Sequence, residues 1–319
     1  MFDVVGLGLN ATDVAIEVPH YPEFNSKVEF RSAGWQAGGQ VATALVVCQR
    51  LGLKTKYIGR VGDEVFGRFQ LESLRREGLE IGDVKVVAEC PNQVAYIIID
   101  AATGERTILW RRDPRLSIQP EEITAEMVTC GRLLHVDGHD TAAAARAASL
   151  ARQAGIQVTA DVDNIYPGLE GLLANVDYLV SSAQFPGAWT GEQELPRALE
   201  RLRAEYGMKL AAATLGRDGV VALTAAGFLY QAAYAVACRD TTGAGDVFHG
   251  AFIYGLLADW PVSRILEFSC AMAGLNSTAL GARGGIASLA EAERLMATGA
   301  RHPARWRNFP AASRSGAGR

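Results

Sequence analysis

A short run of small residues ends in a carboxylate and leads directly into an apolar helical pattern. It reads Asp240-Thr241-Thr242-Gly243-Ala244-Gly245-Asp246 and continues as Val247-Phe248-His249-Gly250-Ala251-Phe252. Residues 243 to 245 leave backbone N–H groups uncovered, and a helix that begins here adds free N–H groups and the positive end of its dipole. An anion such as phosphate would bind there. Asp246, in the first turn, could accept a proton from a phosphoryl acceptor, which is what a kinase requires. Glycines before an acidic first turn also occur in α/β proteins without this chemistry.

This stretch resembles the C-terminal signature of the ribokinase, or PfkB, family of carbohydrate kinases. The resemblance implies that Asp246 is the general base and that the N–H groups of Gly243, Ala244 and Gly245 form the anion hole. It covers residues 2 to about 290 and implies transfer of a phosphoryl group from ATP to a primary hydroxyl of a sugar, with Mg²⁺ as cofactor. An aspartate of ordinary pKa, about 4, would take the proton only as the bond to the leaving group breaks.

The bulk properties favour small-molecule chemistry inside the cell. The 319 residues carry a formal net charge of -4, which argues against nucleic acid as a partner. The five cysteines are widely spaced and indicate neither a disulfide framework nor a zinc site. The N-terminus lacks the pattern of an export signal, so we expect a cytoplasmic protein. Residues 220–238 are uncharged, but Gly227 divides them into two β-like halves, which predicts a buried hairpin and no membrane contact.

The second half of the chain alternates strands with helices. Strands are predicted at 133–136, 157–162, 178–181 and 209–214, and helices at 142–153 and 194–206. This order indicates right-handed βαβ units, and the fold class is α/β: ribokinase-like, with a central, mostly parallel sheet, helices on both faces and a small β-sheet lid. Ligands bind beyond the carboxyl ends of such strands, where we expect Gly138, Asp161, Ser182 and Thr214.

Three alternating stretches predict a smaller sheet: residues 28–32, 95–99 and 107–110. It resembles the family's lid, which covers the sugar and in many members pairs with a second subunit, so the resemblance implies a homodimer. We expect one domain over residues 1–300, with the lid inserted at about 12–34 and 92–112. The remaining residues, 301–319, contain several arginines and no acid, and we expect a mobile basic tail.

The N-terminal half supplies the predicted acceptor site. Gly6-x-Gly8-x-x-Ala11 is similar to a dinucleotide fingerprint, but alternating Val14, Ile16 and Val18 predict a strand where that motif needs a helix. Asp13 resembles the family's sugar-binding aspartate, and capping of a turn is its alternative role.

Gly38 and Gly39 open a predicted helix and resemble the family's N-terminal glycine pair. The asparagine usual after that pair is replaced by Thr43, and Gln40 is expected to compensate. With Gly138, these residues form the predicted substrate site.

Thr214 to Gly219 resembles the family's nucleotide loop and gives Ser182, Thr214, Gly216, Gly219, Thr242 and Gly245 as expected nucleotide contacts. The sequence contains no P-loop motif, so helix termini and Mg²⁺ must balance the phosphate charge. The glutamate of the family's Asn-x-x-Glu motif is missing, which leaves Asp161, Asp163 or Asp240 as outer-shell partners of Mg²⁺. Ala282 to Gly285 resembles a loop that binds a monovalent cation, which makes Asp240, Thr242, Arg283 and Gly285 a possible K⁺ site.

Several assignments stay open. Arg111 or Arg112 could clamp an anion, although a solvated strand end is the preferred interpretation. His135, His139 and His249 form no recognisable motif and are assigned structural roles. Residues 34–39, 106–109 and 247–250 resemble the ketohexokinase and sulfofructose kinase branches, which makes a ketose a candidate acceptor. A nucleoside kinase of the same fold and a non-catalytic protein that senses sugar or nucleotide are the alternatives.

Overall fold

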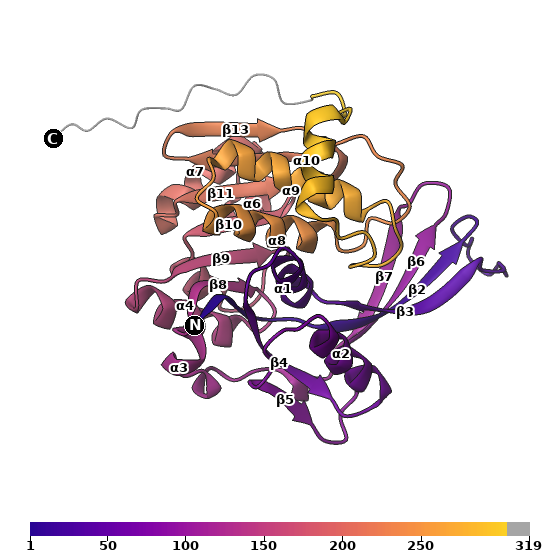
Figure 1. Ribbon diagram of the computed structural model, residues 1–319, viewed down its shortest axis with the longest axis horizontal. Helices are drawn as coiled ribbons and strands as arrows, with labels where there is room; N and C mark the ends of the chain where they lie inside the picture. Colours follow the sequence, from indigo (N-terminus) through magenta and orange to yellow (C-terminus); the bar gives the residue numbers. More distant parts are fainter. Residues whose placement is uncertain (305–319) are drawn as a thin grey trace.

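A computed structural model describes residues 1–304, which build a nine-stranded sheet and a separate four-stranded sheet (Figure 1). The large sheet has the order β13-β12-β11-β10-β9-β8-β1-β4-β5. Its strands are parallel except β12, which runs antiparallel to both of its neighbours. The predicted parallel sheet is thus confirmed. The strands are β1 (Phe2–Leu7), β4 (Thr55–Gly62), β5 (Val84–Val87), β8 (Gly131–Asp137), β9 (Gln157–Val162), β10 (Tyr178–Ser182), β11 (Leu210–Thr214), β12 (Val220–Thr224) and β13 (Gly227–Gln231).

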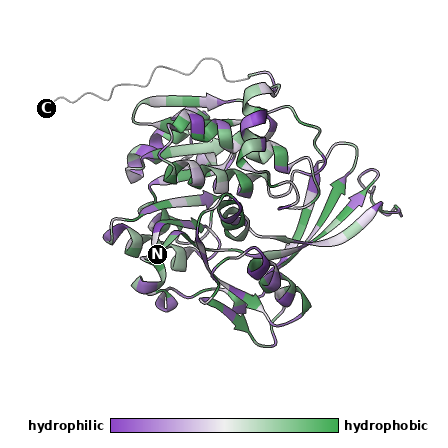
Figure 2. Cartoon of the chain, viewed as in Figure 1, coloured by the Kyte–Doolittle hydropathy of each residue, from purple (hydrophilic) through white to green (hydrophobic). Residues whose placement is uncertain are grey.

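Helices cover both faces of the large sheet, because its strands are apolar on both sides. One layer packs around the helix that follows the Gly-Ala-Gly run and consists of α1 (Gln40–Arg50), α8 (Ala244–Leu257), α9 (Val262–Asn276) and α10 (Leu289–Thr298). The opposite layer consists of α3 (Ala125–Val128), α4 (Thr141–Gln153), α5 (Leu169–Leu173), α6 (Phe185–Thr190) and α7 (Leu195–Tyr206). Hydrophobic residues run along the central strands, whereas the outer helices carry many hydrophilic residues (Figure 2).

The small sheet projects from one side of the molecule and forms the lid (Figure 1). Its order is β3-β2-β6-β7, with β2 (Ala11–Val18), β3 (Ser32–Gly38), β6 (Val94–Asp100) and β7 (Arg106–Arg111). Helix α2 (Val65–Arg76) lies beside it, and the aromatic ring of Trp35 on β3 packs edge-on against Phe66 of α2, with 4.9 Å between the ring centroids. Because side chains alternate along a strand, β7 directs Arg106, Ile108 and Trp110 to one face of the lid.

One lid strand was predicted in the wrong place. Residues 28–31 are outside the sheet, and β3 begins at Ser32, where pairing with β2 starts opposite Glu17. The strand that forms contains Gly34 and Gly38, residues of low intrinsic strand preference. Pairing with β2 therefore outweighs the local pattern that favoured Val28 to Ser32.

The predicted hairpin is confirmed. Residues 220–231 form the antiparallel hairpin β12 and β13, and none of the helices in residues 1–304 is long and apolar enough to cross a membrane. After β1 the chain continues into β2, so no helix begins at Gly6 to Ala11. The dinucleotide-binding interpretation is excluded on this ground.

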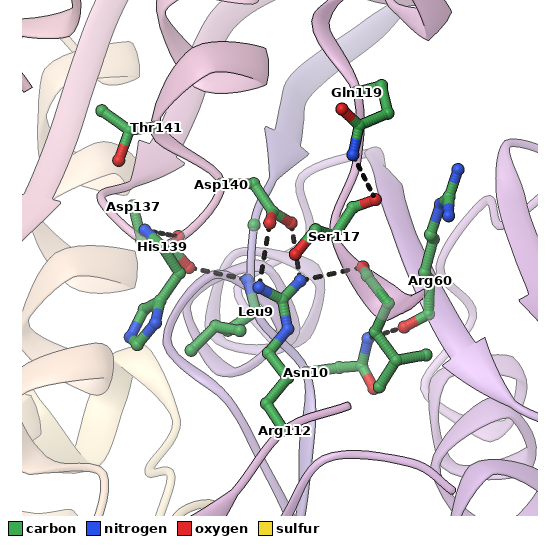
Figure 3. Close-up of polar contacts among 12 residues, drawn as sticks. Leu9, Asn10, Arg60, Arg112, Ser117, Gln119, Asp137, His139, Asp140 and Thr141 are labelled. Carbon is green, nitrogen blue, oxygen red and sulfur yellow. Dashed lines mark hydrogen bonds and ion pairs between the residues drawn. The ribbon is translucent and has the colours of Figure 1, made fainter. Parts of the chain in front are cut away.

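A buried ion pair joins the lid to the body of the molecule (Figure 3). Arg112, just after β7, donates to both carboxylate oxygens of Asp140 at 2.9 and 2.7 Å and to the carbonyl oxygen of Leu116 at 2.9 Å. The Arg112 side chain is only 15% exposed, so the interpretation of a solvated strand end is wrong. Arg111 is exposed, as that interpretation expected.

The start of the predicted tail is anchored. The guanidinium of Arg301 contacts the carboxylate of Glu267 and donates to the hydroxyl of Tyr234 at 2.9 Å. Residues 305–319 of the predicted mobile tail lie outside the described residues.

Candidate active site

Two cavities meet at the carboxyl edge of the large sheet, under the lid. The first, called here the lid cavity, encloses about 520 Å³, and the second, called here the loop cavity, about 380 Å³. Arg106, Thr214 and Gly245 line both, so a molecule in one cavity can contact a molecule in the other. The polar side chains of the lid cavity are Asp13, Gln40, Gln93, Arg106, His139, Asp161, Asp163, Asn164, Tyr166, Ser181, Ser182, Thr214, Thr242, Asp246 and His249.

The start of α8 lies at the junction of the two cavities. Gly243 caps the helix with φ 73°, and a Cβ there would lie 2.5 Å from the Cα of Ala282. Only glycine fits this left-handed and crowded position. The close approach directs the first turn of α8, with its free N–H groups, toward the place where both cavities meet. Gly243 lines the lid cavity, Ala244 the loop cavity and Gly245 both.

Asp246 and Asp13 share the lid cavity, although 233 positions of sequence separate them (246 minus 13). Burial raises the pKa of Asp246 to about 7, and the nearby charge of Asp161 acts in the same direction. Burial, followed by the charge of Asp246, also raises the pKa of Asp13 to about 7. The expectation of an ordinary pKa near 4 for Asp246 is therefore wrong, and a carboxylate with a pKa near neutrality is a better proton acceptor.

The glycine pair brings the start of α1 against the end of β1. Gly39 caps α1 with φ 95°, and a Cβ there would lie 2.4 Å from the Cα of Asn10. A Cβ on Gly38 would lie 2.1 Å from Oδ2 of Asp13. Gln40, the first residue of α1, points into the lid cavity and donates to Oδ2 of Asp161 at 3.4 Å. The two glycines thus make room for Asp13 and aim Gln40.

Some predicted substrate residues do not reach the cavity. The Thr43 side chain is fully buried and accepts a hydrogen bond from Nε of Arg283 at 3.1 Å, so it does not replace the missing asparagine at the cavity wall. Gly38 and Gly138 contribute no lining atoms; a Cβ on Gly138 would lie 2.8 Å from the ring of Tyr166. These glycines act through the space that they leave for Asp13 and Tyr166.

The predicted nucleotide residues divide between the cavities. Gly216 and Gly219 line the loop cavity, both with positive φ, and a Cβ on Gly219 would lie 2.0 Å from the carbonyl oxygen of Gln231. Thr214 lines both cavities, whereas Ser182 and Thr242 line the lid cavity.

Hydrogen bonds within the protein hold the predicted cation loop together. Asp240 is fully buried, and its carboxylate accepts from the N–H of Thr242 at 2.8 Å and of Gly281 at 2.7 Å. The amide of Asn276 donates to the carbonyl oxygens of Thr242 at 3.3 Å and Ala282 at 3.1 Å, and its oxygen accepts from the N–H of Gly285.

The Arg283 side chain points away from that loop, toward the acceptor side. Its guanidinium donates to the carbonyl oxygen of Gly38 at 3.0 Å and to Oγ of Ser73 at 3.3 Å. Burial lowers the pKa of Arg283 to about 10. The K⁺ site stays a prediction for the backbone of the loop. The Arg283 side chain is not part of it, because it donates to Gly38 and Ser73 instead.

Two histidines that were assigned structural roles line the lid cavity. Nε2 of His249 lies 3.2 Å from Oδ1 of Asp161, and the His139 ring lies beside the Tyr166 ring, tilted by 44° with 4.8 Å between the ring centroids. His249 is three residues after Asp246 on α8, which places both on one helix face and could have indicated its position. His135 is fully buried outside the cavity, as expected of a structural residue.

The family model for pfkB carbohydrate kinases matches residues 1–288. The chain belongs to the pfkB family. It is therefore a carbohydrate kinase, a phosphotransferase that uses an alcohol group as acceptor, with the ribokinase-like fold.

Three proteins similar to this pfkB-family kinase share 26% to 28% of its residues over most of its length. An ATP-dependent ribose-1-phosphate kinase of Halopiger xanaduensis is 28% identical over 287 residues, covering 89% of this chain and 94% of the relative. A ribokinase of Schizosaccharomyces pombe is 26% identical, with 92% and 97% covered. A crystal structure described as a ribokinase from Agrobacterium tumefaciens has a TM-score of 0.86 at 27% identity, with 93% and 97% covered.

The contact between Gly38 and Asp13 leads to a first prediction. Gly38→Ala should displace the Asp13 carboxylate, because the added Cβ would overlap it, and should raise the KM for the acceptor by roughly tenfold or more with little change in the KM for ATP. Gly34→Ala on the same strand is the control, since its Cβ meets nothing within 4 Å. Steady-state kinetics of both variants check this, and an equal effect on the two KM values would contradict it.

Proposed function

We propose that this pfkB-family kinase transfers the γ-phosphoryl group of ATP from the loop cavity to a primary hydroxyl of a sugar in the lid cavity. The observation that carries the proposal is the position of Asp246, in the lid cavity and next to the N–H groups that line the junction of both cavities. The names of the relatives, a ribose-1-phosphate kinase and a ribokinase, support a sugar or a sugar phosphate as acceptor. The stretches that resemble ketohexokinases make a ketose such as fructose the first acceptor to test.

In this proposal Asp246 takes the proton of the acceptor hydroxyl, and the N–H groups of Gly243, Ala244 and Gly245 stabilise charge on the phosphoryl group that moves. Asp13 and Gln40 hold other hydroxyls of the sugar, and Gly39 gives the backbone the turn that aims Gln40. Thr214, Gly216 and Gly219 bind the nucleotide in the loop cavity, with Ser182 and Thr242 at its phosphate end.

Mg²⁺ is the divalent cation that the proposal requires, and it would neutralise phosphate charge. Residues 1–304 contain no cluster of three or more His, Cys, Asp or Glu that could hold a metal alone, which suits an ion bound by ATP phosphates and water. Among the three candidate carboxylates, Asp240 is occupied by two backbone N–H groups and Asp161 by His249 and Gln40. Asp163 lines the lid cavity and its carboxylate accepts one side-chain hydrogen bond, from the hydroxyl of Tyr166 to Oδ1 at 3.2 Å, so it is the outer-shell partner that fits best.

Replacing the proposed base gives the central test. In an ADP-release assay with sugars, ketoses and nucleosides, Asp246→Asn should lower kcat by roughly 10²- to 10⁴-fold while the KM for ATP changes little, because the amide cannot accept the proton. Asp259→Asn, an exposed position just past the other end of α8, should keep full activity.

Three outcomes of that assay contradict parts of the proposal. Normal turnover by Asp246→Asn would remove Asp246 from the mechanism. Turnover of adenosine or inosine in preference to every sugar would make the protein a nucleoside kinase. ATP binding without turnover of any acceptor, at several K⁺ concentrations, would favour a sensor.

The five cysteines are all unpaired, which supports a cytoplasmic location that cell fractionation can test.

Arg106 is the lid side chain at the point of transfer. It lines both cavities, and its guanidinium contacts Oγ1 of Thr241, beside the anion hole. A cation there would stabilise the transferring phosphoryl group. We expect Arg106→Gln to lower kcat by roughly 10²-fold. Arg111→Gln changes the same charge on the opposite face of β7 and should leave kcat unaltered; equal losses in the two variants would exclude a specific role for Arg106.

The lid also offers a surface for the proposed homodimer. Trp35, Val14, Tyr96 and Leu109 lie side by side across its four strands, on the face away from the cavity. The three larger side chains are 46%, 44% and 57% exposed, an apolar row that a second copy would cover.

Sedimentation velocity tests this pairing. The wild-type protein should sediment with about twice its 34.1 kDa mass, and Tyr96→Glu should sediment as a monomer because it places a charge in the apolar row. Phe24→Glu, at an exposed aromatic position outside the row, should remain dimeric. A dimer that persists in Tyr96→Glu would place the interface elsewhere.

A further inference from the structure

The lid cavity offers acceptors of hydrogen bonds to whatever binds there. Oε1 of Gln40 and Oε1 of Gln93 are both buried and have no hydrogen-bond partner within the described part of the chain. The Gln40 amide cannot be turned round, because its nitrogen faces the carboxylate of Asp161. The Asp13 carboxyl group, in its ionised form, is a third acceptor in the same wall. Three oxygen acceptors suit the O–H groups of a sugar and repel the oxygens of a phosphate or carboxylate.

The cationic side chains near this wall either bind other groups of the protein or lie at the junction of the two cavities. Within residues 1–304, no lysine lines the lid cavity, and Arg106 is the one arginine that does. Arg106 lies at the junction, where the γ-phosphoryl group must pass. The Arg112 guanidinium donates hydrogen bonds to Asp140 and Leu116. The Arg283 guanidinium donates to Thr43, Ser73 and Gly38.

The two histidines of the cavity do not supply a free positive charge. His249 contacts Asp161, so a proton on its ring would be balanced by that carboxylate. His139 is neutral at physiological pH, since burial and the nearby charge of Arg112 lower its pKa to about 4. The lid contributes the uncharged side chains of Ile97, Ile108 and Trp110 to the wall. Asn164, Tyr166 and Ser182 add groups that are polar but uncharged.

We infer that the acceptor sugar of this kinase carries no anionic substituent. An acceptor with its reacting hydroxyl at Asp246 would direct its remaining substituents to Gln40, Gln93 and the lid wall, where an anion would meet carbonyl and carboxylate oxygens without a counter-charge. The inference rests on the proposed function. It selects neutral sugars over sugar phosphates, aldonates and sulfosugars.

The test compares each neutral sugar with its own anionic derivatives in the ADP-release assay. Pairs include ribose with ribose 1-phosphate, fructose with fructose 1-phosphate, and glucose with gluconate. The best neutral acceptor should exceed its anionic partners in kcat/KM by roughly 10²-fold or more, the size of an uncompensated like-charge contact. An anionic acceptor that exceeds every neutral sugar would overturn the inference and leave the kinase proposal intact.

A variant with a positive charge added to the lid wall provides a second test of the inference. Trp110→Arg should raise the ratio of anionic to neutral kcat/KM at least about tenfold, because it supplies the missing counter-charge. Trp110→Leu removes the same ring without adding charge and should not raise that ratio. Equal ratios in both variants would overturn the electrostatic account.

Measurements of sugar binding distinguish failure of this inference from failure of the proposed function. Calorimetric titration of the same sugar pairs into Asp246→Asn loaded with ADP measures acceptor binding without turnover. Neutral sugars should bind and their anionic partners should not. If that pattern holds while the wild-type enzyme releases no ADP with any sugar, the proposed function fails and the inference about the cavity stands. Tighter binding of the anionic partners would overturn the inference directly.

Discussion

The fully buried carboxylate of Asp240 is the contact on which the arrangement of the site depends. It accepts from the N–H of Thr242 and from the N–H of Gly281, and so fixes the loop before α8 against the loop after α9. The Cα of Ala282 then lies where any side chain on Gly243 would have to go. Removing a buried carboxylate of this kind leaves two N–H groups without partners, at a cost of about 1–3 kcal/mol each. The direction of the first turn of α8, and with it the position of Asp246, follows from this contact.

The loop after α9 also contacts the residues proposed to bind the acceptor sugar. Arg283 leaves it and donates to the carbonyl oxygen of Gly38 and to Thr43, at the start of α1. Gly38 in turn lies against the Asp13 carboxylate. One chain of contacts therefore runs from the proposed anion hole to the proposed sugar-binding aspartate. This explains why a buried arginine is tolerated: its charge is shared among three oxygen acceptors and lies near two buried carboxyl groups, Asp13 and Asp246.

The sequence allowed prediction of those parts that depend on local pattern. The alternation after Leu133 predicts the parallel strands, and the run from Asp240 to Asp246 predicts the helix start with its acidic first turn. Features set by distant contacts could not be predicted in this way. From the sequence, Thr43 fits a position in the cavity wall. In the structure its hydroxyl instead accepts a hydrogen bond from Arg283, 240 positions away. The raised pKa of Asp246 depends on burial and on Asp161, and β3 is determined by its partner β2.

The lid is attached to the body at both ends of β7, and this geometry gives its arginines different roles. Arg112, at the base, is nearly buried and holds both oxygens of Asp140, which caps the start of α4. Arg106, at the other end, reaches Thr241 just before the anion hole while remaining exposed. A buried bidentate pair is costly to break, whereas an exposed contact to a hydroxyl exchanges readily with water. The base of the lid is thus fixed, and its tip can give up Thr241 for a stronger partner. A phosphoryl group entering between the two cavities would be such a partner, because a guanidinium binds a charged oxygen more strongly than a hydroxyl.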